Sequence, residues 1–309
     1  MGRRAFDHRY CFGFSRHLIM RHLKKLKPFF AIIILTAVLV FSQWSYAGHA
    51  FGRGRLIVWF FDVGQGDAIF IETPSGHQML IDGGPGDVVI SKLGSVMPFW
   101  DRAIDDVLLT HPHADHLDGL VDVVDRYRVS RVYISGVDFY TPLGPEFYAR
   151  VSDGETVIDV TRPQEIDLGG GVILRLLYTT SSLVGRQIDD ANASSLVGLL
   201  TYGETSVLLT GDITAEREAE IAVQLDAPVD VLKVAHHGSA YSSTMDFLNV
   251  AKPQVAVISV GADNDYGHPA ASTLDRLRAI GAAVLRTDID GDIRLISDGL
   301  EPTLAKLPL

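Results

Sequence analysis

The chain has 309 residues, of which 47% are hydrophobic, which suits the core of a large α/β domain and excludes a disordered chain. Of its 27 Lys and Arg and 38 Asp and Glu, eight basic residues and one acid precede residue 51, so the rest carries 19 basic and 37 acidic residues, a net charge of −18 with His neutral. That balance disfavours a general grip on a phosphate backbone, and the single cysteine, Cys11, excludes disulfides, cysteine-bound zinc and a cysteine nucleophile beyond residue 50.

The first 50 residues combine a basic start with an apolar run. Residues 29–41 are apolar apart from Thr36, which is typical of a signal peptide cleaved after Ala47 or Ala50. If 43–47 extend the helix, the run reaches about 19 residues and would form an uncleaved membrane anchor; a buried soluble helix is the alternative. Whether the segment is a signal peptide or an anchor, we expect the body to be exported. It would be periplasmic or extracellular, or held at the membrane with the body outside the cytoplasm. We expect 1–50 to be this segment and 51–309 to be one domain.

From residue 56 the pattern changes to short strands separated by glycine-rich turns. A first series of strands is expected at 56–61, 68–71, 79–81, 106–110 and 132–134, with helices at 87–98 and after 116. For residues 136–170 we expect loops and one short helix near 145–151. A second series is expected at 172–178, 195–202, 206–210, 230–235, 255–260, 283–286 and 293–296, with helices at 214–225, from about 243, and at 272–280. Two such series predict an α/β (α+β) domain with two sheets face to face and helices outside.

Four strong metal ligands follow one buried strand within six residues. They are His111, His113, Asp115 and His116. Side chains alternate along an extended chain, so His111 and His113 project the same way, while Asp115 begins the next helix. A chance polar loop is the alternative, which this density of ligands disfavours. The pattern predicts a metal centre.

Two later strands end in residues of the same kind. Asp212 follows a buried strand and Gly211, where an acid is costly unless paired; a helix cap is the alternative. His236 and His237 follow another strand, and either can be the ligand. We expect one ion at His111 and His113, a second at Asp115, His116 and His237, and Asp212 between them. Ions roughly 3.5–4 Å apart share a hydroxide, which would be the nucleophile.

Four more residues lie in turns near the expected centre. Asp82, in Ile-Asp-Gly-Gly, would hold a ligand imidazole or simply form the turn. Asp67, in Gly-Gln-Gly-Asp, would face substrate or form an Asx turn. His268 would donate a proton to the leaving group or hold a phosphate, and we expect it to act in catalysis with Asp115. Ser239 is a candidate substrate contact.

Seven short motifs occur in order between residues 62 and 269, and together they are specific. They are DVGQGD (62–67), LIDGG (80–84), THPHADH (110–116), NxxSLV (192–197), LTGD (209–212), LKVAHHGS (232–239) and YGHP (266–269). In them the chain resembles a metallo-β-lactamase-fold hydrolase, and more narrowly the soluble hydrolase domain of ComEC-type competence proteins, the DNA-uptake channel family. The resemblance implies a four-layer αββα sandwich after one hydrophobic N-terminal helix, and metal-dependent hydrolysis.

One position departs from the wider fold. A His usually completes the first metal site before the strands that end in Gly-Asp, but this chain has no His between 117 and 235 and has Asn192 in the matching region. Asparagine suits harder cations than imidazole does. The resemblance therefore implies two divalent ions, Zn²⁺ or Mn²⁺, with a weaker first site and Asn192 beside it.

We expect a metal-dependent hydrolase that acts on a phosphoester, as a phosphodiesterase or a nuclease-like enzyme does. The resemblance implies that this phosphoester is DNA. The alternatives are a hydrolase of a small ester that is not nucleic acid, a lactonase or β-lactamase, and a competence-related binding module without catalysis. The charge of −18 favours a small substrate over DNA, and the intact ligand set opposes the binding module. The sequence predicts no oligomeric state.

Overall fold

The computed structural model describes residues 32–40, 54–138, 141–151, 156–178 and 185–307. By its internal contacts the chain divides into two units, Met1–Phe51 and Gly52–Leu309. In the first unit, residues 32–40 form a helix. Among the described helices, none combines the length and the apolar character that a membrane span requires. The two expected cleavage positions, Ala47 and Ala50, lie outside the described residues.

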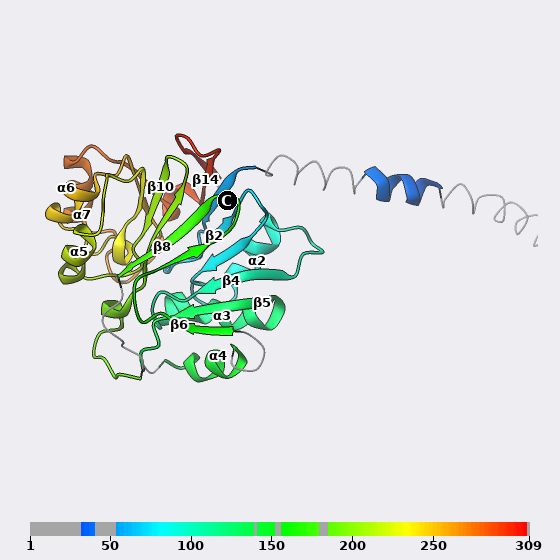
Figure 1. Ribbon diagram of the computed structural model, residues 1–309, viewed down its shortest axis with the longest axis horizontal. Helices are drawn as coiled ribbons and strands as arrows, with labels where there is room; N and C mark the ends of the chain where they lie inside the picture. Colours follow the sequence, from blue (N-terminus) through cyan, green and yellow to red (C-terminus); the bar gives the residue numbers. More distant parts are fainter. Residues whose placement is uncertain (1–31, 41–53, 139–140, 152–155, 179–184, 308–309) are drawn as a thin grey trace, which may run out of the picture. The chain divides into compact units, whose positions relative to one another are not determined.

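The second unit is built on two sheets (Figure 1). The first has eight strands in the order β15 (Thr303–Leu307), β14 (Asp292–Ser297), β1 (Leu56–Phe60), β2 (Ile69–Glu72), β3 (Gln78–Ile81), β4 (Ala103–Leu108), β5 (Arg128–Ile134) and β6 (Thr156–Asp159). The second has seven in the order β13 (Ala283–Arg286), β12 (Val255–Ile258), β11 (Val231–Lys233), β10 (Thr205–Leu209), β9 (Val197–Tyr202), β8 (Val172–Tyr178) and β7 (Gln164–Asp167).

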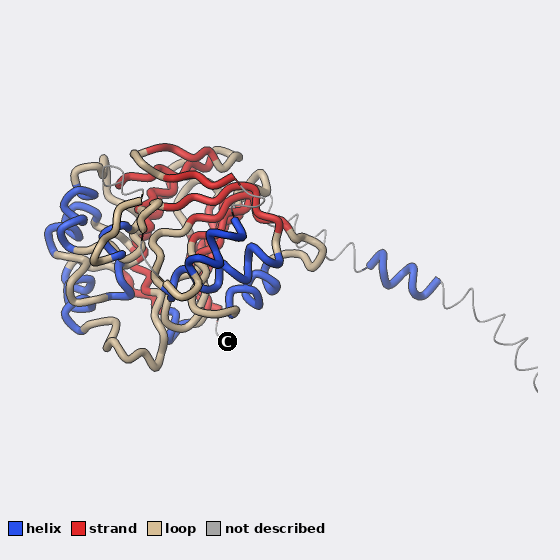
Figure 2. The backbone as a smooth tube through the Cα atoms, turned by 90° about the horizontal axis from the view of Figure 1, so that it is seen from below, coloured by secondary structure: helices blue, strands red, loops and turns tan. Residues whose placement is uncertain are grey.

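Helices cover the outer face of each sheet (Figure 2). Those on the first sheet are α2 (Val88–Val96), α3 (Ala114–Arg126) and α4 (Gly144–Val151), and those on the second are α5 (Ala215–Ala222), α6 (Met245–Ala251) and α7 (Ala271–Ala279). Short helices lie in the connections: η1 (Ala191–Ser194), η2 (Ala235–Gly238) and α8 (Thr287–Asp290). Three separate apolar cores fill the space between the sheets and beneath each helical layer. The predicted αββα sandwich is confirmed.

Alternation of side chains along the strands produces these cores. In β11, Val231 packs in the core between the sheets, and Leu232 packs beneath the outer helices. In β1, Leu56, Val58 and Phe60 all belong to the core between the sheets. A strand between two layers needs apolar side chains on both faces, which is why the buried strands have so few polar residues.

Parallel strands determine where the polar loops gather. The pairs β3–β4, β10–β11 and β11–β12 are parallel, so the loops that follow these strands leave at their carboxyl ends. Loops at the carboxyl ends of parallel strands meet along one edge of a sheet. The residues that follow β3, β4, β10, β11 and β12 include almost all of the predicted ligands.

The C-terminal strands complete the first sheet. β14 pairs antiparallel with β1, which lies between β14 and β2. The first residue of β14, Asp292, accepts hydrogen bonds from the backbone N–H of Asp62 and from Lys92, both at 2.8 Å. The segment that leads out of β1 is thus fixed by a residue 230 positions later in the chain.

The prediction of loops and one short helix for 136–170 is wrong in part. The helix α4 is present, but β6 and β7 also lie in this stretch, and β15 and α8 near the C-terminus were not predicted. β6 and β7 have four residues each, lie at sheet edges, and bury one side chain between them, Ile166. Such strands have too few buried positions to show a clear alternation.

Candidate metal centre

Histidine and aspartate side chains from the segments that follow four strands meet at the edge of the sandwich. The loop after β4 brings His111 and His113, α3 begins with Asp115 and His116, the loop after β3 brings Asp82, the loop after β10 brings Asp212, and η2 brings His237. His111, His116, Asp212 and His237 are all buried. Their burial in a polar cluster requires that each group be paired or bound to a cation.

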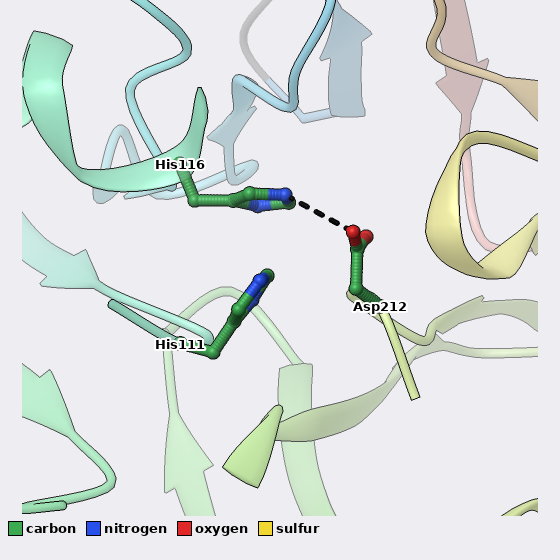
Figure 3. A group of neighbouring side chains, drawn as sticks. All are labelled: His111, His116 and Asp212. Carbon is green, nitrogen blue, oxygen red and sulfur yellow. Dashed lines mark ion pairs between the residues drawn. The ribbon is translucent and has the colours of Figure 1, made fainter. Parts of the chain in front are cut away.

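The side chains point toward a common centre (Figure 3). His116 Nε2 lies 3.5 Å from Asp212 Oδ2. His237 Nε2 lies 3.3 Å from Asp115 Oδ2 and 3.3 Å from Asp212 Oδ2. His111 Nε2 lies 3.1 Å from His113 Nδ1. Two ligand atoms about 2.1 Å from one ion at tetrahedral angles are about 3.4 Å apart, so these separations fit ligands that share an ion.

Several buried atoms of the cluster have no hydrogen-bond partner among the described residues. They are His116 Nε2, His237 Nε2 and Asp212 Oδ1. The groups His111–His116–Asp212 and Asp115–His116–His237 each place three possible ligand atoms within 4.8 Å of one another. Imidazole nitrogens and carboxylate oxygens are ligands of divalent transition metals. The donor set therefore fits a divalent metal.

Asp82 orients two of the imidazoles. Its carboxylate accepts hydrogen bonds from the Thr110 N–H (2.8 Å), the Thr110 hydroxyl (2.7 Å) and His116 Nδ1 (2.7 Å). Because the Thr110 proton goes to Asp82, His111 Nδ1 donates to Thr110 Oγ1 at 3.0 Å. In both rings Nδ1 is thus held as the donor, so Nε2 is the atom that faces the cluster and would bind a metal.

The His237 ring is oriented from the second sheet. Its Nδ1 donates to the carbonyl oxygen of Ser259 at 3.0 Å, so Nε2 is the ring atom that faces the cluster. The backbone there is strained: His236 and His237 have φ of 53° and 52°, and Asp82 across the cluster has φ of 58°. Non-glycine residues rarely adopt such angles, and they gather at functional sites.

Charges in the cluster shift each other's proton affinity. Burial lowers the pKa of His237, but the charge of Asp212 and the close approach of the Asp115 carboxylate outweigh it and raise the pKa to about 10. His116 behaves alike: burial is outweighed by Asp212 and Asp82, and its pKa lies well above the usual value. Burial raises the pKa of Asp212, but the charges of His237 and His116 outweigh it and hold that pKa well below normal. In the metal-free protein, protons on two imidazoles thus balance the carboxylates.

Two hollows open beside the cluster. The smaller, about 300 Å³, is lined by Gln65, His113, Ala114, Asp115, Asp212, His236, His237, Tyr266 and His268. The larger, about 680 Å³, is lined by residues that include Asn192, Glu216, Tyr241 and His236, so His236 borders both. The cluster is therefore accessible to a substrate from one side.

His268 lies in the wall of the smaller hollow. Its ring stacks on Tyr266 with centroids 5.9 Å apart, and its backbone is held by Asn264, which accepts from the His268 N–H at 2.9 Å. Burial, with the neighbouring His236 and His237, lowers the pKa of His268. Its Nδ1 has no hydrogen-bond partner among the described residues.

A close backbone contact holds the 62–67 turn against α3. The Asp67 N–H donates to the Asp115 carbonyl oxygen at 3.2 Å, and a Cβ on Gly66 would clash with that same oxygen. Glycine is required at position 66 because only a residue without a Cβ allows this approach. The turn thus fixes the backbone of one candidate ligand.

Comparison with known families agrees with this architecture. The family described as Metallo-beta-lactamase superfamily matches residues 61–262. The chain belongs to this superfamily. With the His and Asp cluster, membership identifies a metallo-beta-lactamase-fold, metal-dependent hydrolase that binds divalent metal.

The similar curated proteins include three connected by name with competence or recombination. ComE operon protein 3 of Bacillus subtilis (strain 168) is 30% identical over 260 residues, which are 75% of this chain and 32% of that protein. Competence protein ComA of Neisseria gonorrhoeae is 28% identical over 81% of this chain and 33% of that protein. Recombination protein 2 of Haemophilus influenzae is 30% identical over 87% and 32%. The chain spans about a third of the length of these relatives.

Solved structures share the metallo-beta-lactamase fold. CmlA, a diiron beta-hydroxylase from Streptomyces venezuelae, superposes with a TM-score of 0.51 at 19% identity, over 82% of this chain and 54% of that one. The metallo-beta-lactamase fold protein YhfI from Bacillus subtilis has a TM-score of 0.50 at 12% identity, over 75% and 95%. At such identities the likeness shows the fold alone.

In this superfamily member, the two adjacent histidines differ clearly. His237 is buried and its Nε2 lies within the cluster, whereas the half-exposed His236 has its Nε2 4.0 Å from Asp212 Oδ2 and borders both hollows. Asn192 lines the larger hollow, and its Oδ1 is buried without a hydrogen-bond partner among the described residues.

Ser239 lies apart from the described hollows. It is buried, its hydroxyl accepts from the Tyr241 N–H at 3.3 Å, and its carbonyl oxygen accepts from the Thr273 hydroxyl at 2.8 Å. These contacts place Ser239 in the turn after η2, and its contact with a substrate stays a prediction.

Other residues of the centre were not predicted from the sequence. Thr110 relays the Asp82 contact, Ser259 orients His237 through its carbonyl oxygen, and Gln65 and Tyr266 line the smaller hollow. Lys233 contacts Asp67 at 2.7 Å. Lys233 could have been noticed in the sequence, because a lysine within an apolar strand is unusual. The contact through the Ser259 carbonyl oxygen could not, because any residue has a main-chain carbonyl.

Replacing Asp82 with asparagine is expected to weaken metal binding by about 10–100-fold, the usual effect of removing a group that orients a ligand. Asparagine tolerates the positive φ at this position, so the fold should persist. A Zn²⁺ titration against a chromophoric chelator measures the change. Asp62→Asn, in the neighbouring turn, is the control, and an unchanged affinity in Asp82→Asn would contradict the orienting role.

Proposed function

We propose that this chain hydrolyses phosphodiesters, with divalent ions held by His111, His113, Asp115, His116, Asp212 and His237. The observation that carries the proposal is the convergence of His116 Nε2, His237 Nε2 and Asp212 Oδ1 beside an accessible hollow, all three buried and without a hydrogen-bond partner among the described residues. Bound divalent ions would act as Lewis acids and lower the pKa of water to near neutrality.

Within this proposal the ligands divide into two groups that share Asp212. His111 and His113 serve one ion, and Asp115, His116 and His237 serve the other, with Zn²⁺ or Mn²⁺ in each. Asp82 and the Ser259 carbonyl keep the Nε2 atoms turned inward, so the ligands need little rearrangement on binding. Asn192, in place of an imidazole, leaves the first ion with fewer strong ligands.

His268 and His236 would face the substrate across the smaller hollow. Because the pKa of His268 is lowered, its ring is mostly neutral at pH 7 and would donate an N–H to a phosphoryl oxygen more readily than release a proton. Two imidazoles beside an anion-binding centre suit a phosphodiester better than an uncharged ester. The resemblance to competence proteins makes DNA a natural substrate within this class.

A second candidate is a small phosphoester or another small ester. The net charge of −18 beyond residue 50 opposes a long polyanion, and a hollow of about 300 Å³ accommodates a small molecule. We also propose that the body is exported, because a basic start precedes the apolar run at 29–41. Under this proposal the substrate lies outside the cytoplasm.

The full chain, stripped of metal and reloaded with Mn²⁺ or Zn²⁺, should hydrolyse bis-p-nitrophenyl phosphate, as followed by absorbance. A chromogenic β-lactam and a lactone are the matched comparison substrates, and neither should turn over. Faster cleavage of single-stranded or duplex DNA would select the nuclease form, whereas turnover of bis-p-nitrophenyl phosphate without DNA cleavage would select the small substrate. If the protein bound no metal and hydrolysed none of these substrates, the proposal that it is an enzyme would be refuted.

A further inference from the structure

Lys233 is the only buried lysine or arginine in the described part of the chain. It lies at the end of β11 on the same face as Val231, which packs in the core between the sheets. Its Nζ lies 2.7 Å from Asp67 Oδ2 and donates to the Val234 carbonyl oxygen at 3.1 Å. Asp67 lies in the turn between β1 and β2 of the other sheet and is also buried, so this ion pair joins that turn to the end of β11.

Asp67 also touches two of the proposed ligands. Its Oδ1 lies 3.5 Å from His237 Nδ1, and its N–H donates to the Asp115 carbonyl oxygen. In addition, Asp67 lies within metal-binding distance of the cluster, in the groups Asp67–Asp212–His237 and Asp67–Asp82–His116. Its carboxylate is thus close enough to join the ligands, yet one of its oxygens is taken by Lys233.

A buried ion pair is a poor means of stabilising a fold. Removing two charges from water is costly, and an apolar pair of similar volume is often as stable or more so. Asp67 and Lys233 are both buried, and Asp67 lies beside Asp212 and His237. Their position beside the cluster points to a role in arranging it.

We propose that Lys233 is a positioning residue of the metal centre, which holds the Asp67 carboxylate out of the ligand set and against His237. The inference rests on the metal centre proposed above but not on its substrate. The pair contributes no net charge to the centre. Loss of Asp67 alone leaves the Lys233 cation unpaired beside the bound ions and repels them. Loss of both members restores neutrality.

A single and a double variant test this on the full chain, by chelator competition for Zn²⁺ and Mn²⁺ with no dependence on turnover. Asp67→Asn should weaken metal binding by about 10–100-fold, the range for residues that support ligands. The neutral pair Asp67→Asn/Lys233→Met should bind metal within about threefold of the unmodified protein, since the lone cation is gone. Circular dichroism melting confirms that each variant is folded.

The matched control uses the ion pair between Asp290 and Lys306. It compares the single variant Asp290→Asn with the double variant Asp290→Asn/Lys306→Met. That ion pair has the same residue types and the same 2.7 Å separation, but its lysine is exposed. Neither control variant should change metal affinity. Wild-type affinity in folded Asp67→Asn would make the pair merely structural, and equally weak binding in Asp67→Asn and its double variant would make Asp67 itself a ligand. Either result overturns the proposal, while the hydrolysis assay remains an independent test of the activity.

Discussion

Replacing Asp115 or His116 with alanine should abolish hydrolysis while the protein stays folded. A bound metal ion supplies several kcal/mol of transition-state stabilisation, so losing a ligand should lower kcat by roughly 10²–10⁴-fold. His116 is fully buried with its Nε2 turned to Asp212, and the Asp115 carboxylate lies 3.3 Å from His237 Nε2. Both residues therefore sit in the proposed second group of ligands. Steady-state kinetics on bis-p-nitrophenyl phosphate measures the effect.

His116→Gln is the safer variant at the buried position, because it keeps a polar side chain against Asp82 where alanine leaves a cavity. Asp122→Ala is the control: it removes an acid from the same helix, where Asp122 pairs with Arg126 at the surface. Its kinetics should match the unmodified protein. Retained activity in folded Asp115→Ala would contradict the two-ion scheme.

Metal binding should release protons and strengthen steeply as pH rises from 6 to 8. In the metal-free protein the pKa of His237 is about 10 and that of His116 lies well above its usual value, so both rings carry a proton that a metal must displace. Each proton released raises the affinity about tenfold per pH unit below that pKa. Calorimetric titration in buffers of different ionisation enthalpy counts the protons.

The raised pKa of His237 also makes the stability of the metal-free protein depend on pH. The folded pKa of His237 lies above the unfolded value of about 6.5, so its ion pairs stabilise the fold fully below pH 6.5 and are lost as pH rises toward 10. His237→Gln should reduce proton release by one, whereas His77→Gln, in an ion pair outside the cluster, should leave it unchanged. A metal affinity independent of pH would contradict this description.

The ligands were predictable where they are contiguous or end a buried strand. His111 to His116 lie within one motif, and Asp212 follows an apolar strand, so chain position alone indicates a shared site. The groups that orient them were harder to predict. Ser259 acts through a main-chain atom, and Lys233 meets Asp67 only after two sheets have packed. Such contacts depend on tertiary packing, which a local pattern does not contain.

The sandwich could be predicted from the motifs and the two series of strands, but its strand order could not. β14 and β15 follow the second sheet in the chain and yet belong to the first. β6 and β7 are too short and too exposed to show a period. Edge strands take their pairing from the neighbouring strand rather than from their own composition.

The pairing of β14 with β1 also bears on the order in which the protein assembles. Until β14 has been synthesised and has left the ribosome, β1 has no partner on that side, and Asp292 is not available to fix Asp62 and Lys92. The turn that carries Asp67 therefore cannot settle against α3 early in synthesis. Contacts between such distant parts of a chain form slowly. The metal centre should accordingly mature only once β14 has paired with β1, and a nascent chain that lacks β14 would bind metal weakly.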